Sequence, residues 1–146
     1  MTSDEQRRHL AGLPHGREFT FVRELVSCEA GTAAECATSF SADDPVLAGH
    51  FPGNPLLPGV ILTEALAQTA GIAAASGYPD GARPLFLLSA IRSMKFARAV
   101  RPREEIQLCA RKIGEMGDLL QFRVEARIGA ERVATGEIVL AKTPPQ

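Results

Sequence analysis

The segment over residues 45–79 contains a single formally charged residue, Glu64. Within it, residues 58–77 are mostly Ala, Leu, Ile and Val. Proline suits the first turn of a helix and glycine suits its C-terminal cap, so Pro58 and Gly77 predict one helix about 30 Å long over 58–77. Because no Lys or Arg marks a solvated side, we expect this helix to be buried nearly all round.

Glu64 is the residue of this helix that most needs an explanation. An unpaired carboxylate among apolar residues is costly, so Glu64 is paired, protonated or retained for chemistry. Its position alone leaves two interpretations equally open, a structural carboxylate that bridges a dimer interface and a functional group. His50 beside Phe51, taken alone, is more typical of a hydrogen-bonded structural histidine than of a catalytic base.

Strand patterns lie on both sides of the predicted helix. Residues 19–29 and 32–41 predict two strands about a turn at Gly31, and a loop rich in Gly and Pro follows over 43–58. Apolar runs and alternation predict the later strands at 84–91, 106–111, 120–128 and 132–142. This order predicts an α+β domain, with one long helix packed on a curved antiparallel sheet. We expect a single domain over 1–146, with about 1–12 and 143–146 peripheral or flexible.

Several classes of protein are disfavoured. Residues 1–9 are polar and charged, unlike a secretory signal. The polar residues Glu64 and Gln68 argue against a membrane span over 58–77. The cysteines are odd in number and lack the spacing of a zinc site; they are Cys28, Cys36 and Cys109. We therefore expect reduced thiols, no metal and a cytoplasmic location.

A longer motif surrounds Glu64. Residues 50–71 read HFPGNPLLPGVILTEALAQTAG, which resembles the signature of the 3-hydroxyacyl-[acyl-carrier-protein] dehydratases of fatty-acid synthesis. The match includes a His-Phe-Pro-Gly segment, a Pro-Gly pair that opens the helix, and Glu64 fourteen residues after His50. The segment Leu13-Pro14-His15 is similar to the family's N-terminal segment. The resemblance implies a hotdog fold, in which a curved antiparallel sheet wraps a long helix.

The resemblance also implies a reaction, the dehydration of a 3-hydroxyacyl thioester to a trans-2-enoyl thioester. This reaction needs a base, an acid and a stabiliser of negative charge. The family assigns the C2 proton to His50, and protonation of the departing hydroxyl to Glu64. The backbone N–H of Gly59 at the helix N-terminus would stabilise the thioester oxygen, and Gln68 would hold the Glu64 carboxyl or a water.

In this family the His and the acidic residue of one site come from different subunits. That arrangement implies a homodimer here, and hexamers are also known in the family. The acyl chain would enter an apolar tunnel along the helices, and Phe51 and Pro58 are expected to contact the substrate. No cofactor is implied. Arg103 stands where many members have Gly, which predicts a more constrained backbone.

Two other functions remain open at this point. The first is a hotdog acyl thioesterase, which also uses a helix carboxylate and a helix N-terminal oxyanion site. The second is a non-catalytic hotdog subunit that binds acyl carriers. Release of a free thiol would identify the thioesterase, and carrier binding without turnover would identify the binding subunit.

The net charge of −1 hides an uneven distribution along the chain. Residues 1–80 carry a net charge of −6 and residues 81–146 carry +5, so we expect no nucleic-acid partner but a local positive surface. Residues 81–103 contain six basic residues and no acidic one. Because acyl carrier proteins are acidic and the resemblance places this segment near the tunnel mouth, we expect four residues to dock the carrier: Arg92, Lys95, Arg98 and Arg101.

Overall fold

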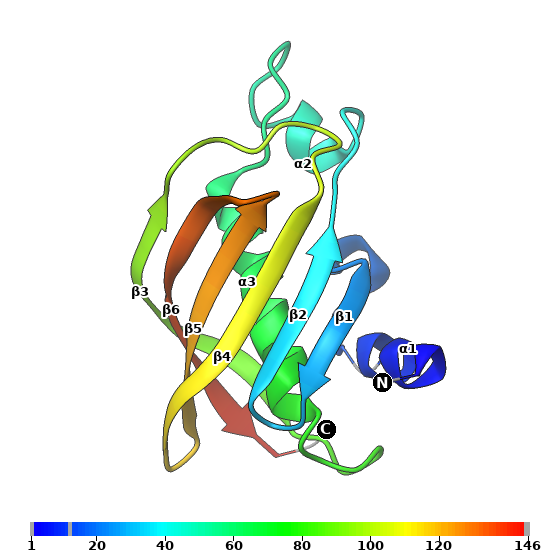
Figure 1. Cartoon of the computed structure of the whole chain (residues 1–146), viewed down its shortest axis with the longest axis vertical. Coiled ribbons are helices and arrows are strands. Elements are labelled where there is room, and N and C mark those ends of the chain that lie inside the picture. Colours follow the sequence, from blue (N-terminus) through cyan, green and yellow to red (C-terminus); the bar gives the residue numbers. More distant parts are fainter. Residues whose placement is uncertain (1, 12, 145–146) are drawn as a thin grey trace.

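The computed structural model describes residues 2–11 and 13–144, which form an antiparallel sheet curved around one long helix (Figure 1). The strands are β1 (Glu24–Glu29), β2 (Ala33–Thr38), β3 (Leu85–Phe96), β4 (Ile106–Met116), β5 (Leu119–Ile128) and β6 (Glu131–Thr143). Their order across the sheet is β1-β2-β4-β5-β6-β3. The long helix is α3 (Gly59–Ala75), and the shorter helical elements are α1 (Ser3–Ala11), η1 (Arg17–Phe19) and α2 (Pro45–Ala48). The predicted α+β class is confirmed.

Helix α3 occupies most of the predicted range. Pro58 is its N-cap and keeps an extended backbone, with φ −60° and ψ 137°, so the helix proper begins one residue later. The helix ends at Ala75, and Gly77 follows it. A Cβ added at Gly77 would lie 3.1 Å from the Cα of Gly31, so the missing side chain lets the end of α3 meet the turn between β1 and β2.

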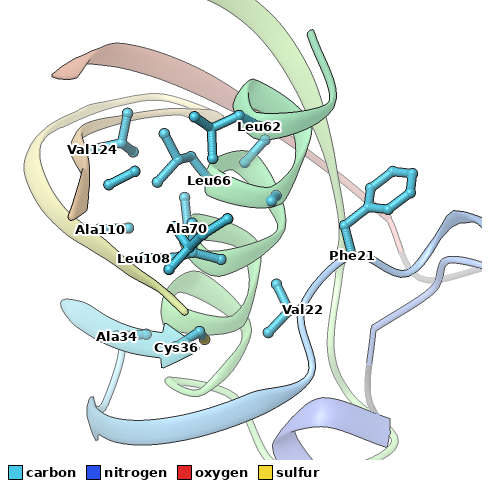
Figure 2. Packing of buried hydrophobic residues seen from close by; sticks show 14 of the residues in the cluster. Phe21, Val22, Ala34, Cys36, Leu62, Leu66, Ala70, Leu108, Ala110 and Val124 are labelled. Atoms are coloured by element: carbon cyan, nitrogen blue, oxygen red, sulfur yellow. The ribbon is translucent and has the colours of Figure 1, made fainter. Parts of the chain in front are cut away.

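Apolar side chains of α3 fill the concave side of the sheet (Figure 2). Leu62, Leu66 and Ala70 are at most 2% exposed. They pack against buried residues of β4 and β5, including Leu108 and Val124. Complete burial of one such leucine contributes about 2 kcal/mol, so this helix is the centre of the core.

The N-terminal part of the chain contains the largest departures from the predicted elements. The first strand begins at Glu24 rather than at residue 19, because residues 17–19 form the η1 turn. Residues 3–11 form α1, an element that the sequence did not predict, and Gln6 donates a hydrogen bond to the Val26 carbonyl at 3.2 Å. The expectation that this segment is peripheral or flexible stays a prediction. Residues 1 and 12 lie outside the described part of the chain.

The other departures are additions to predicted elements. Helix α2 lies within the predicted loop 43–58, and the Asp44 carboxylate caps it by accepting the Val46 N–H at 3.0 Å. Strand β3 continues to Phe96, beyond the predicted end at residue 91, and β4 continues to Met116, beyond the predicted end at residue 111. At the C-terminus β6 includes Thr143, where a tail was expected, and residues 145–146 lie outside the description.

Strand β3 contains a bulge that interrupts its alternation. Its pairing with β6 shifts between Arg92 and Lys95, and Ser93 has a φ of 54°. Met94 lies directly over Gly136 of β6, where an added Cβ would be 2.8 Å from the Met94 Cα. Gly136 therefore provides the space that this bulge requires.

The cysteines are all free thiols. Burial raises the pKa of Cys36 to about 12, so this thiol stays protonated at neutral pH. Nowhere in residues 2–11 and 13–144 is there a helix long and apolar enough to cross a membrane.

Candidate active site

His50 belongs to the loop between α2 and α3. This loop stands above the N-terminal end of α3 in Figure 1. The backbone N–H of His50 donates to the Leu47 carbonyl at 3.2 Å, which fixes the residue just after α2. Its side chain is exposed, and its ring lies 4.0 Å from the ring of Phe51 between centroids. Phe51 is itself 50% exposed. The two rings thus form an uncovered aromatic pair at this end of the molecule.

One hydrogen bond defines how His50 can act. Its Nδ1 lies 3.2 Å from the carbonyl oxygen of Leu56. A carbonyl oxygen only accepts hydrogen bonds, so Nδ1 carries the proton in the neutral ring. The lone pair is then on Nε2. His50 therefore has the tautomer that a base acting through Nε2 requires.

Glu64 lies in the second turn of α3, and its side chain is 19% exposed. Its Oε1 is 3.3 Å from Nε2 of His15 and 3.4 Å from Nε2 of Gln68. The contact expected between Gln68 and Glu64 is thus present. The sequence assigned no role to His15, although its Leu-Pro-His segment matched the family, and this match was the one available signal.

Gln68 also fastens the N-terminal segment to α3. The side chain is 1% exposed, and its Nε2 donates to the Phe19 carbonyl at 2.7 Å. Its Oε1 accepts the Phe21 N–H at 2.9 Å. These backbone bonds place His15 over Glu64.

Gly59 and Pro58 form the N-terminal end of α3. The first amides of a helix have no carbonyl one turn earlier to pair with, so the Gly59 N–H is a donor directed out of this end. A Cβ added at Gly59 would meet the Phe96 ring at 3.3 Å. Pro58 is buried, whereas Phe96 is 47% exposed. A glycine thus allows β3 to approach the helix end closely.

A narrow cavity of about 60 Å³ begins at Glu64 and follows α3. Its side walls include Gly71, Ile72 and Phe86, and its lining also includes Arg83. The Arg83 side chain is 14% exposed and pairs with Asp80 at 2.9 Å. The cavity is therefore mainly apolar between two polar regions, which fits an acyl chain better than a polar metabolite.

A larger hollow, of about 860 Å³, lies on the outer face of the sheet and contains none of these groups. Its charged residues are largely paired with one another, as in Arg111 with Glu29 at 3.0 Å and Arg123 with Glu137 at 3.5 Å. The chemical groups favour the smaller cavity as the site, because Glu64 and His15 line it and neither of them lines the hollow.

Within one chain, no hydrogen bond or ion pair between His50 and Glu64 occurs among the described residues. His50 is exposed on its loop, whereas Glu64 is occupied by His15 and Gln68. The expectation that the two meet across subunits therefore stays a prediction.

The four residues expected to dock a carrier differ in their surroundings. Arg98 donates two hydrogen bonds to Glu104, at 2.9 and 2.8 Å, and one to Glu131 at 3.0 Å. These carboxylates largely neutralise its charge. The other three, Arg92, Lys95 and Arg101, are exposed, and none forms an ion pair with another residue in the described ranges. The docking role of all four remains a prediction.

Comparison with known proteins extends the resemblance beyond the motif. Residues 27–137 match the family model of the ApeI-like dehydratases. The chain is 35% identical over 136 residues to the 3-hydroxyacyl-[acyl-carrier-protein] dehydratase FabZ of Chloroflexus aggregans, covering 93% of this chain and 94% of that protein. It is 34% identical over 143 residues to FabZ of Ruminiclostridium cellulolyticum, covering 98% and 99%.

A solved structure confirms the hotdog fold. The dehydratase heterocomplex ApeI:P from Xenorhabdus doucetiae contains a chain with a TM-score of 0.78 to this one and 18% identity. The alignment covers 97% of this chain and 91% of that chain. The similarity therefore includes both the N-terminal segment with His15 and the strands that follow α3.

Proposed function

Because this chain belongs to the family of the ApeI-like and FabZ 3-hydroxyacyl-[acyl-carrier-protein] dehydratases, we propose that it removes water from a 3-hydroxyacyl thioester on an acyl carrier protein. The product is the trans-2-enoyl thioester, in fatty-acid or related acyl-chain synthesis. The observation that carries this proposal is Glu64, a carboxyl in an otherwise uncharged helix that opens onto an apolar cavity.

The proposed chemistry follows from the two side chains. His50 Nε2 takes the proton from C2, the electron pair of that C–H bond forms the C2=C3 double bond, and the C3–O bond breaks. Glu64 gives its proton to the departing hydroxyl, which leaves as water. The Gly59 N–H stabilises negative charge on the thioester oxygen, at the helix end where the dipole favours it. Protons exchanged with solvent then restore both groups.

We assign His50 and Glu64 of one site to two subunits of a homodimer. Strand β3 supports this assignment because it is an edge strand that carries several exposed apolar side chains. Leu87 is 49% exposed, Ile91 is 52% exposed and, on the adjoining end of α3, Val60 is 76% exposed. An exposed apolar edge is a typical surface for pairing with a second copy.

A mixing experiment tests the shared site. His50→Ala and Glu64→Gln are each expected to lose turnover, measured by the absorbance of the enoyl thioester. Unfolding and refolding the two variants together forms mixed dimers, each with one intact site, and restores roughly a quarter of wild-type activity. Two inactive variants that stay inactive when mixed would show that both residues act within one subunit.

We further propose that the basic residues of β3 and the following loop dock the acidic carrier. Lys95→Glu is expected to raise KM for the carrier substrate at low salt while leaving kcat unchanged, and the difference shrinks at high salt. Lys95 lines the hollow on the outer face of the sheet. Lys112→Glu is the matched control, because Lys112 is absent from that lining and already pairs with Glu115 at 3.1 Å near the turn between β4 and β5. Equal effects of the two reversals at all salt concentrations would contradict this docking surface.

Hydrolysis is the alternative that the same assay separates. A thioesterase would release free thiol without enoyl product. His50 argues against it, because a hydrolase does not need a base for a C2 proton, and the tautomer of His50 suits that step.

A further inference from the structure

His15 lies between α1 and η1, and its Nε2 contacts the Glu64 carboxyl at 3.3 Å. The His15 side chain is 26% exposed, so the contact is partly sheltered from water. The ring also stacks on Phe19, with 6.1 Å between centroids.

The two donors that reach Glu64 both contact the same oxygen. His15 Nε2 and Gln68 Nε2 each lie near Oε1. In a neutral carboxyl, the oxygen that accepts N–H donors is the carbonyl oxygen, and the proton is on the other oxygen. We infer that His15 is a positioning residue that holds Oε1 of Glu64, so that Oε2 carries the proton delivered to the departing hydroxyl. This inference rests on the proposed dehydration.

The surroundings of His15 keep it in this role. Donation from Nε2 leaves Nδ1 with a lone pair, and this atom is buried without a hydrogen-bond partner among the described residues. A doubly protonated ring would bury an N–H that has no acceptor, which costs more than an unpaired lone pair. His15 therefore donates from Nε2. His50 has the opposite tautomer, with Nδ1 protonated on the Leu56 carbonyl and Nε2 available as the base.

Hydrogen bonds hold the segment that carries His15 in place in the absence of substrate. Gln68 binds the backbone of Phe19 and Phe21, one helical turn beyond Glu64. The Thr20 hydroxyl donates to the Gly16 carbonyl at 2.9 Å. His15 gains and loses no proton during the reaction; its effect is on where the Glu64 proton points.

Three variants test this role with the carrier substrate. His15→Phe keeps an aromatic ring that can stack on Phe19 but removes the N–H donor. This variant is expected to lower kcat about 10-fold to 100-fold, while KM changes less than about threefold. His15→Gln places an N–H near the position of Nε2, and is expected to restore kcat to within about fivefold of wild type. Thr38→Val removes a 2.6 Å hydrogen bond to the Phe21 carbonyl, so it loosens the same segment without touching Glu64.

The outcomes separate positioning from simple packing. Thr38→Val is expected to lower Tm and keep kcat within about twofold of wild type. The inference is overturned if His15→Phe retains wild-type kcat, if His15→Gln is no better than His15→Phe, or if Thr38→Val loses as much kcat as His15→Phe. Failure of the proposed function gives a different result, because the wild-type protein itself would then form no enoyl product.

A second measurement does not depend on turnover. The nitrogen chemical shifts of the imidazole rings at neutral pH are expected to show His15 protonated at Nε2 and His50 protonated at Nδ1. A His15 ring protonated at Nδ1, or at both nitrogens, would overturn the inference even in an inactive preparation.

Discussion

Gln68 joins helix α3 to the backbone of Phe19, through a 2.7 Å hydrogen bond from its Nε2 to the Phe19 carbonyl. The same side chain accepts the Phe21 N–H, so one buried amide satisfies two backbone groups of the segment that covers Glu64. Gln68 therefore contributes both to the stability of the fold and to the geometry around Glu64.

Replacing this amide should destabilise the protein strongly. Gln68→Met keeps the length of the side chain but leaves two backbone groups without partners, so we expect the free energy of unfolding to fall by about 3 kcal/mol in urea titrations. Thr63→Val is the control, since its hydroxyl bonds only to the Gly59 carbonyl one turn earlier in the same helix. Equal losses in the two variants would contradict the fastening role of Gln68.

Glu64→Gln should separate stability from activity. The amide oxygen can accept the N–H donors of His15 and Gln68, so we expect Tm to remain close to that of the wild type. The amide cannot deliver a proton, so kcat is expected to fall about 10²-fold to 10⁴-fold. Thermal denaturation measures Tm, and the absorbance of the enoyl thioester measures kcat. A stable Glu64→Gln variant with wild-type turnover would show that Glu64 is not the acid of the reaction.

Replacing Arg103 with glycine should stabilise the protein. Arg103 has a φ of 66°, in the left-handed region, while its N–H donates to the Phe40 carbonyl at 2.7 Å. A residue with a side chain in this region destabilises the folded state by about 1–2 kcal/mol. Glycine avoids this strain, but its greater freedom in the unfolded chain offsets about 0.5–1 kcal/mol of the gain. We expect Arg103→Gly to raise the free energy of unfolding by about 0.5–1 kcal/mol and Arg103→Val to lower it. A glycine variant less stable than the valine variant would contradict this account.

The ion pair of Glu104 predicts a pH dependence of stability. Hydrogen bonds from Arg98 lower the pKa of Glu104 below its ordinary value of 4.5. A carboxylate with a lowered folded-state pKa stabilises the fold above that ordinary value, and the stabilisation is lost as the pH falls through the lowered value. Glu104→Gln should therefore be less stable than wild type at pH 7, with a smaller difference at pH 3.

Urea unfolding at pH 7, 5 and 3 measures this difference. Glu105→Gln serves as the control, because this exposed neighbour forms no ion pair with another residue of the described chain. A difference between wild type and Glu104→Gln that stays constant across the three pH values would exclude the pair as its source.

The sequence predicted the elements whose patterns are local. The apolar composition of 58–77 identified α3, and the strict alternation in 120–128 identified β5. The η1 turn was missed because the side chain that binds its Phe19 carbonyl is that of Gln68, far along the chain. The full length of β3 was missed because the apolar run that predicted this strand ends at Ile91, before Arg92 and the bulge at Ser93.

The candidate site was predictable where one motif contains its residues. His50, Gly59, Glu64 and Gln68 lie in one continuous segment, and their motif identified them. His15 belongs to another part of the chain and meets Glu64 only after the sheet and α3 have formed. Neither periodicity nor spacing reports such a contact, because it depends on tertiary packing.

Leu13, Pro14 and His15 form one wall of the cavity along α3. The cavity of about 60 Å³ is small beside the roughly 300–1,000 Å³ of a typical ligand pocket, so a long acyl tail enters by displacing a wall. Displacement of this wall moves His15, which supports the acid. Selectivity for chain length would then arise in the chemical step, with longer substrates turning over more slowly even when they bind well.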